Sequence, residues 1–138
     1  MTVSVVVVGV GYVGLPLVQE ACRRDMRVVG LDVDQEVVAS LLNGESHIDD
    51  VDSVGVAEML AAGFAATTDP ICIRYADVIV ICVPTPLDGD GTPDLGAVKA
   101  ASRTVSENLQ QGSLVVLEST TYPGTTEDTV RPLLEDGS

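Results

Sequence analysis

Aromatic residues are scarce in this sequence, which has three tyrosines, one phenylalanine and no tryptophan among 138 residues. A hydrophobic core must therefore be built from valine, alanine, leucine and isoleucine, within a hydrophobic content of 46%. That content favours a folded chain over a disordered one. An aliphatic core suits a parallel sheet covered by helices, and the length leaves room for one domain and hardly for two.

Basic residues are scarce as well: there are 7 Lys and Arg against 21 Asp and Glu, and the net charge is −14. A surface this acidic repels nucleic acid and anionic membranes, so we expect neither as a partner. It also repels a phosphate-bearing ligand at long range. A phosphate site must therefore depend on local backbone N–H groups.

Cysteines are few, and none forms a CxxC pair: they are Cys22, Cys72 and Cys82. An odd count argues against a disulfide framework and favours a reducing compartment. Residues 1–4 lack the basic region of a secretory signal, and the apolar run at 5–8 is far too short to span a membrane. We therefore expect a cytoplasmic protein.

Strand-like and helix-like segments alternate along the chain. We predict strands at 4–8, 27–32, 64–67, 78–83 and 114–118, and helices at 12–24, 37–42, 54–62, 95–109 and 125–134. In the first helix, Val13, Leu17 and Ala21 share one face. This order predicts an α/β fold of Rossmann type, with a doubly wound, mostly parallel sheet and helices on both faces.

The turn after the first predicted strand has the pattern Gly9-x-Gly11-x-x-Gly14. Gly9 permits a tight turn, Gly11 a close approach of the backbone to a pyrophosphate, and Gly14 close packing of helix on sheet. The exposed N–H groups and the helix dipole would bind the anion. A glycine turn in some other α/β protein is the alternative, which the flanking strand and helix disfavour.

An acidic residue, Asp32, ends the second predicted strand, close to the expected distance beyond the glycines. Its carboxylate is expected to receive the 2′-hydroxyl of a ribose and to repel a 2′-phosphate. No arginine follows within residues 33–36. The sequence therefore predicts NAD, rather than NADP, as the cofactor.

Two polar segments follow later strands, at the edge where ligands of open α/β sheets bind. In Val83-Pro84-Thr85-Pro86, Thr85 either faces that edge or fills a turn that ends the strand, and the residues alone do not separate these interpretations. In the segment 118–124, Ser119 is expected to cap a turn or helix, whereas Thr120 can serve either role.

Other reactive side chains are poorer candidates. His47, the only histidine, lies in an acidic loop and is expected to be solvated, and Cys82 is expected to be an inert thiol in a buried strand. Cys72 has Arg74 nearby but no histidine base. No metal-ligand spacing is present, and the run at 49–52 is expected to be a solvated turn rather than a calcium loop.

Five segments share their pattern with one enzyme family: GVGYVGLPL (9–17), GLDVD (30–34), LNGESHI (42–48), VPTPLDGDGTPDL (83–95) and LVVLESTTYPGTT (114–126). In this order they resemble the N-terminal domain of the UDP-glucose/GDP-mannose dehydrogenase family, over nearly the whole chain. The last two segments look closest to the branch that acts on UDP-N-acetylmannosamine or UDP-N-acetylglucosamine.

This resemblance implies an enzyme that oxidises the C6 alcohol of a UDP-sugar to a carboxylate and reduces two NAD. In the family, a cysteine captures the aldehyde as a thiohemiacetal, which is oxidised to a thioester and hydrolysed. Tyr12, Val13, Asp32, Thr85 and Thr120 match cofactor-contacting positions of the family. Thr120 also matches a threonine that helps to position the catalytic water.

The chain departs from the family pattern in three respects. No basic residue follows Asp32 within 35–38, and residues 49–51 replace a Glu-Pro pair of the family. The nucleophilic cysteine and its partners lie in later segments of the family, and no cysteine here matches that position. We therefore expect residues 1–138 to be an NAD-binding fragment, inactive alone, of a full-length protein that forms a homodimer and binds the UDP-sugar mainly through other domains.

Two alternatives have a similar cofactor domain. A 3-hydroxyacid or 6-phosphogluconate-type dehydrogenase is disfavoured, because the segments at 84–86 and 118–120 match the nucleotide-sugar family instead. The second alternative is a non-catalytic module that binds NAD.

Overall fold

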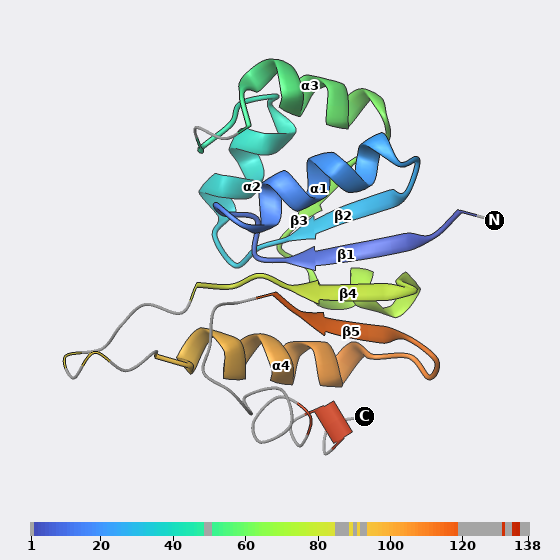
Figure 1. The fold of residues 1–138 in the computed structure, drawn as a ribbon, viewed down its shortest axis with the longest axis vertical. Coiled ribbons are helices and arrows are strands. Elements are labelled where there is room, and N and C mark those ends of the chain that lie inside the picture. The colour runs from blue at the N-terminus through green and yellow to red at the C-terminus, as the bar shows by residue number, and fades with distance from the viewer. Residues whose placement is uncertain are drawn as a thin grey trace.

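In the part of the chain that the structure describes, five parallel strands form one sheet in the order β3-β2-β1-β4-β5 (Figure 1). The computed structural model describes residues 2–48, 51–84, 89, 91, 94–118, 131, 134 and 135. The strands are β1 (Ser4–Val8), β2 (Arg27–Leu31), β3 (Ala65–Thr67), β4 (Val78–Ile81) and β5 (Leu114–Leu117). Every pairing among them is parallel, so the predicted Rossmann-type α/β fold is confirmed.

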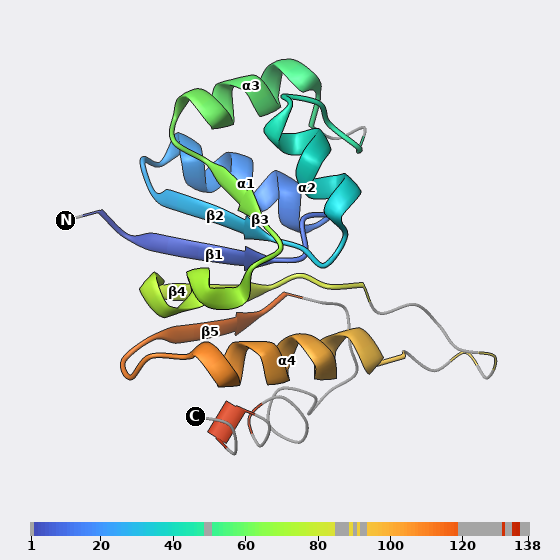
Figure 2. The ribbon, with the colours of Figure 1, turned by 180° about the vertical axis from the view of Figure 1, so that it is seen from behind.

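Helices cover both faces of this sheet (Figures 1 and 2). They are α1 (Gly14–Arg23), α2 (Gln35–Leu42), α3 (Ser53–Ala61), the 3₁₀ helix η1 (Pro70–Tyr75) and α4 (Gly96–Asn108). Leu15 of α1 and Val56 of α3 belong to the core on one face, and Ile73 of η1 and Val105 of α4 to the core on the other. Within the described part, no helix is long and apolar enough to cross a membrane.

Aspartate caps set several helix starts that differ from the sequence prediction. Asp34 accepts a hydrogen bond from the Glu36 N–H at 2.9 Å, so α2 begins two residues before the predicted start at 37. The η1 helix was not predicted at all. Asp69 caps it by accepting from the Ile71 N–H at 3.0 Å, and a proline occupies its first position, so an Asp-Pro start signal was present in the sequence.

The buried face of α1 differs in part from the predicted one: Ala21 is buried as predicted, whereas Val13 and Leu17 are not. Leu15 and Val18 are fully buried, whereas Val13 is 52% exposed and Leu17 is only partly buried. Val13 is the N-cap residue, so it belongs to the loop before the helix and does not contribute to the helical stripe. The helix predicted at 125–134 falls almost entirely on residues outside the described part.

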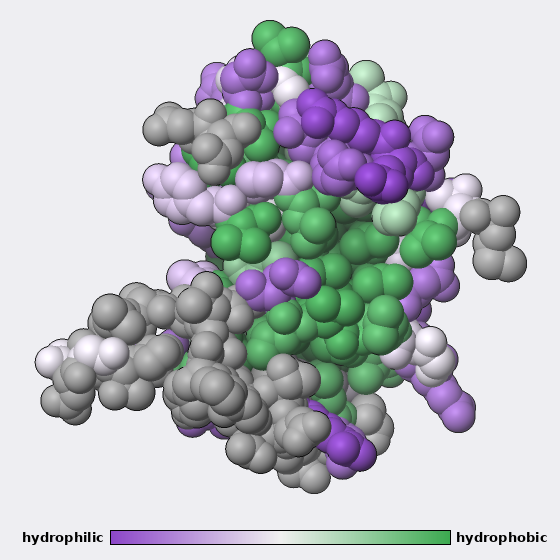
Figure 3. Space-filling model, in the orientation of Figure 1, coloured by the Kyte–Doolittle hydropathy of each residue, from purple (hydrophilic) through white to green (hydrophobic). Residues whose placement is uncertain are grey.

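One part of the α1 side of the sheet carries exposed apolar residues. Figure 3 shows hydrophobic residues gathered on this face, over β1, β4 and β5. The strand register places Val5, Val78 and Leu114 in one row, and Leu114 is 58% exposed. The helix α1 packs over the strands β1 and β2. On this side, fewer side chains therefore cover the sheet toward β5.

Candidate dinucleotide-binding site

The glycine turn and Asp32 meet at the carboxyl edge of the sheet. Parallel strands bring their carboxyl ends to one edge, so the turn after β1 lies beside the residue after β2. A cavity of about 440 Å³ opens there. Its lining includes the predicted site residues Gly9, Gly11, Tyr12, Val13 and Asp32.

The conformation of this turn requires glycine at two positions. Gly9 has a φ of +90°, and a Cβ there would lie 3.0 Å from the carbonyl carbon and oxygen of Cys82. A Cβ at Gly14 would overlap the carbonyl oxygen of Gly9. The predicted reasons for these two glycines, a tight turn and close packing of the helix on the sheet, are confirmed.

The backbone donors at the start of α1 are open. Among the described residues, the N–H groups of Gly11, Tyr12, Val13 and Gly14 have no hydrogen-bond acceptor. Val13 supplies no side-chain cap, and the first turn of α1 has no acidic residue. A Cβ at Gly11 would meet no heavy atom within 4 Å. The turn therefore offers free N–H groups and space for an anion at the positive end of the helix dipole.

Two backbone hydrogen bonds hold the Asp32 carboxylate in place. Oδ2 accepts from the Val10 N–H at 3.0 Å, and Oδ1 accepts from the Asp34 N–H at 3.0 Å. A carboxylate has about four acceptor positions, so each oxygen can still accept a bond from a ligand hydroxyl. The bond to Val10 also ties the end of β2 to the glycine turn, a structural role that the sequence did not reveal.

A second, apolar cavity of about 280 Å³ lies on the other side of Asp32. The two cavities share Gly9, Asp32, Val33, Val83 and Pro84. The second is closed by small side chains of α4: Ala97, Ala100, Ala101 and Thr104. Sequence reasoning missed this wall, although small residues at helical spacing were a usable signal.

Val33 and His47 also line these cavities. Val33, directly after Asp32, is 98% exposed and borders both of them. His47 is exposed, as predicted, but it lines the larger cavity, which the sequence did not indicate.

None of the three thiols is activated as a nucleophile. Burial, and secondarily the Glu118 carboxylate, raises the pKa of Cys82 to about 11. Burial also raises the pKa of Cys22, and burial with the nearby Asp69 carboxylate raises that of Cys72. A raised pKa leaves the neutral thiol at physiological pH, so the expectation of an inert Cys82 agrees with the structure.

Two predicted site residues, Thr85 and Thr120, lie outside the described residues. Their roles toward the cofactor therefore stay predictions. Within the described part, no group of three or more His, Cys, Asp or Glu side chains is placed to hold a metal ion.

Known proteins match this chain over nearly its whole length. The model of the UDP-glucose/GDP-mannose dehydrogenase family, NAD binding domain, matches residues 3–138. The UDP-N-acetyl-D-mannosamine dehydrogenase of Escherichia coli (strain K12) is 37% identical over 134 residues, which are 96% of this chain and 31% of that protein. The UDP-N-acetyl-D-glucosamine 6-dehydrogenase of Pseudomonas aeruginosa is 37% identical over 132 residues, with the same coverage of 96% and 31%.

A solved structure of a related enzyme has the same fold as this chain. The UDP-glucose dehydrogenase from the hyperthermophilic archaeon Pyrobaculum islandicum superposes with a TM-score of 0.93 at 31% identity, over 99% of this chain and 33% of that one. The chain thus spans about a third of the length of the relatives that it matches. With a family match over residues 3–138, this chain belongs to the UDP-glucose/GDP-mannose dehydrogenase family and corresponds to its NAD-binding domain.

Proposed function

We propose that this chain is the cofactor domain of an NAD-dependent enzyme that oxidises the C6 alcohol of a UDP-sugar to a uronate. The observation that carries the proposal is a single cavity that contains both the open N–H groups at 11–14 and the anchored Asp32 carboxylate. Free donors suit a diphosphate, and a fixed acceptor suits a ribose hydroxyl. NAD carries both groups, and when bound it supplies the hydride acceptor.

Different described residues would bind different parts of the cofactor. The N–H groups of the glycine turn would bind the diphosphate, and Asp32 would accept from the hydroxyls of the adenosine ribose. The apolar cavity between Val33 and α4 would take the adenine, because it adjoins Asp32 and is lined mostly by carbon. Thr85 and Thr120, which match cofactor-contacting positions of the family, complete the proposed cofactor site, and Thr120 would also position the catalytic water.

The proposed substrate is UDP-N-acetylmannosamine, UDP-N-acetylglucosamine or UDP-glucose. Relatives with 31–37% identity bear the names of enzymes for these UDP-sugars. The nucleophilic cysteine implied by the family resemblance is not one of the three thiols here, because none of them matches its position in the family, and burial raises the pKa of each. The proposal therefore includes further segments that bind the sugar and supply the nucleophile, a homodimeric whole protein and a cytoplasmic location.

Calorimetry with NAD and NADP tests the cofactor part of this proposal. We expect NAD to bind the wild-type chain more tightly than NADP, because Asp32 would repel a 2′-phosphate. The Asp32→Asn variant should lose most of this preference, since it removes the charge and keeps one oxygen acceptor. Asp77→Asn, on the opposite edge, is the matched control and should keep it. Equal affinity of the wild type for both cofactors would contradict the assignment.

An assay of NADH formation tests whether other segments are needed for catalysis. The chain alone, supplied with NAD and each of the three UDP-sugars, is expected to produce no NADH above background. Sustained turnover by this chain would contradict the inference that other segments supply the nucleophile. Such a result would leave the NAD site itself intact.

A further inference from the structure

We propose that His47 is a further binding residue for the cofactor, whose protonated imidazole pairs with the diphosphate. The inference rests on the proposed function, because it names a side chain that acts on the same ligand in the same cavity. The family resemblance assigned no role to this residue, and the acidic sequence around it predicted only a solvated side chain.

His47 lies beside the glycine turn, on the lining of the same cavity. His47 follows α2 in the sequence, and the exposed segment that carries it returns to the carboxyl edge of the sheet. There it lines the cavity of about 440 Å³ together with Gly11, Tyr12 and Val13, whose N–H groups are open. An anion bound by those donors would therefore share one cavity with the imidazole.

Carboxylates line the cavity near His47. Among the described residues, the carboxylates that line this cavity are those of Asp32 and Asp34, and neither cavity is lined by a described lysine or arginine. The chain as a whole has a net charge of −14. Among the described lining residues, a diphosphate thus meets two carboxylates, and the imidazole is the side chain of this set that can offset them.

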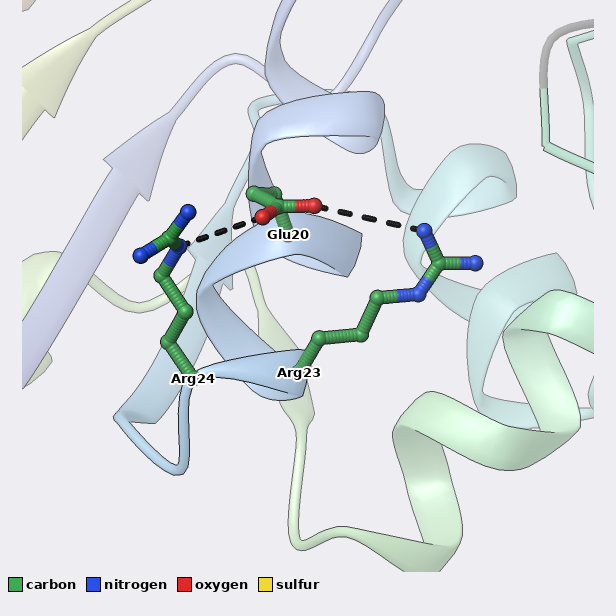
Figure 4. A network of polar contacts seen from close by, with 3 residues as sticks. All are labelled: Glu20, Arg23 and Arg24. Atoms are coloured by element: carbon green, nitrogen blue, oxygen red, sulfur yellow. Dashed lines mark hydrogen bonds and ion pairs between the residues drawn. The ribbon is translucent and has the colours of Figure 1, made fainter.

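The arginines nearest in sequence to the glycine turn lie at the other end of α1. Figure 4 shows Arg23 and Arg24 reaching Glu20 from two sides, at 4.0 Å and 3.1 Å. Glu20 lies in the last turns of α1, whereas the open donors precede its first turn. Arg23 and Arg24 therefore pair with Glu20 at the far end of α1, and they supply no positive charge to the cavity.

The contribution of a single imidazole can be isolated in this cavity. The titratable groups facing the cavity with His47 are Tyr12, Asp32, Asp34 and Cys82, and Glu45 is exposed on its own segment. Burial raises the pKa of Cys82 to about 11, so this thiol is neutral in the experiment below. His47 is the only histidine in the chain, so replacing it removes the one imidazole from this cavity.

The test is the pH dependence of NAD affinity, measured by calorimetry between pH 5.5 and 8.5. The diphosphate of NAD stays ionised throughout this range. For the wild type we expect affinity to be about two- to fivefold higher at pH 5.5 than at pH 8.5, as for an exposed ion pair. His47→Ala and His47→Gln should both show a flat profile at the wild-type value of pH 8.5. Because His47 is exposed, neither variant should change the melting temperature.

Two controls distinguish this inference from the proposed function. Arg27→Ala removes a positive charge from the exposed start of β2 at the opposite edge, and it should keep the wild-type pH profile. Adenosine, which lacks phosphate, should bind the wild type without pH dependence. A flat wild-type profile, a slope that persists in His47→Ala, or an equal slope with adenosine would overturn the role of His47 while NAD binding stands. A wild-type chain that binds no NAD at any pH would overturn both.

Discussion

The two edges of this sheet use aspartate and backbone groups in opposite ways. At the carboxyl edge, Asp32 is fixed by two N–H groups, and the neighbouring donors of the glycine turn remain open. At the amino edge, the Asp77 carboxylate accepts from the Ser4 N–H at 2.9 Å, and its own N–H donates to the Ser4 carbonyl at 2.8 Å. Its carbonyl accepts from the Leu114 N–H at 3.0 Å.

Asp77 thus joins β1, β4 and β5 and satisfies the backbone groups around it, whereas Asp32 holds one strand end beside unsatisfied donors. The first N–H groups of a helix have no partner within the helix, and Tyr12 and Val13 are exposed, so the informative feature is that these open donors line a cavity beside Asp32. The difference indicates that the amino edge contributes to stability and the carboxyl edge to ligand binding.

The largest expected effect is on the fold, from Gly14→Ala. The new Cβ would overlap the Gly9 carbonyl oxygen, and backbone atoms cannot move aside as the end of a flexible side chain can. We expect the free energy of unfolding to fall by about 3 kcal/mol or more, measured by chemical denaturation. A variant as stable as the wild type would show that the turn does not have this geometry.

Gly11→Ala separates ligand binding from stability at the same turn. A Cβ there meets no heavy atom within 4 Å, so we expect stability to change by less than about 1 kcal/mol. Affinity for NAD should fall about tenfold or more, since the methyl group would occupy the space in which a diphosphate meets the N–H groups. Calorimetry and denaturation on one preparation check both parts. Unchanged affinity would remove the turn from the site.

Asp77→Ala is the corresponding change at the amino edge. Loss of the bond to the Ser4 N–H should lower the free energy of unfolding by about 1 kcal/mol, and NAD affinity should stay at the wild-type value. Asp77→Asn, which keeps an oxygen acceptor, should recover part of the loss in the same denaturation experiment. A weakened affinity for NAD in either variant would break the contrast between the edges.

The smallest expected effect concerns Cys82, which lines the cavity at the carboxyl edge. Burial raises its pKa from 9.0 to about 11, so the folded state favours the neutral thiol. That contribution to stability is complete below about pH 9 and declines as the pH rises toward 11. In Cys82→Ala, denaturation between pH 8 and 10.5 should show a shallower decline than in the wild type. Equal declines would mean that this thiol is not responsible.

Features encoded by neighbouring residues were predictable from the sequence. The β-branched run at 4–8, the spacing of Gly9, Gly11 and Gly14, and the position of Asp32 each depend on a short segment. They sufficed for the fold, the turn and the cofactor class. The family resemblance added what the spacing alone could not, because the glycine pattern occurs in many α/β proteins.

Features that depend on distant segments were not predictable in this way. The bond from the Val10 N–H to Asp32 requires the register of β1 against β2, and the apolar wall of α4 reaches Val33 only in the folded sheet. The position of His47 depends on how the segment after α2 returns to the edge. The exposed Val13 was predicted on the helical face because its spacing fits, but it occupies the N-cap position, before the first helical residue.

The central claim is that the carboxyl edge binds NAD through its open backbone donors. An NMR titration of the ¹⁵N-labelled chain with NAD tests it directly, because each amide reports separately. We expect the largest shifts at Gly11–Gly14 and at Val33, and no shift at Ser4, Asp77 or Leu114. Shifts concentrated at the amino edge, or an absence of shifts at the glycine turn with saturating NAD, would contradict the account.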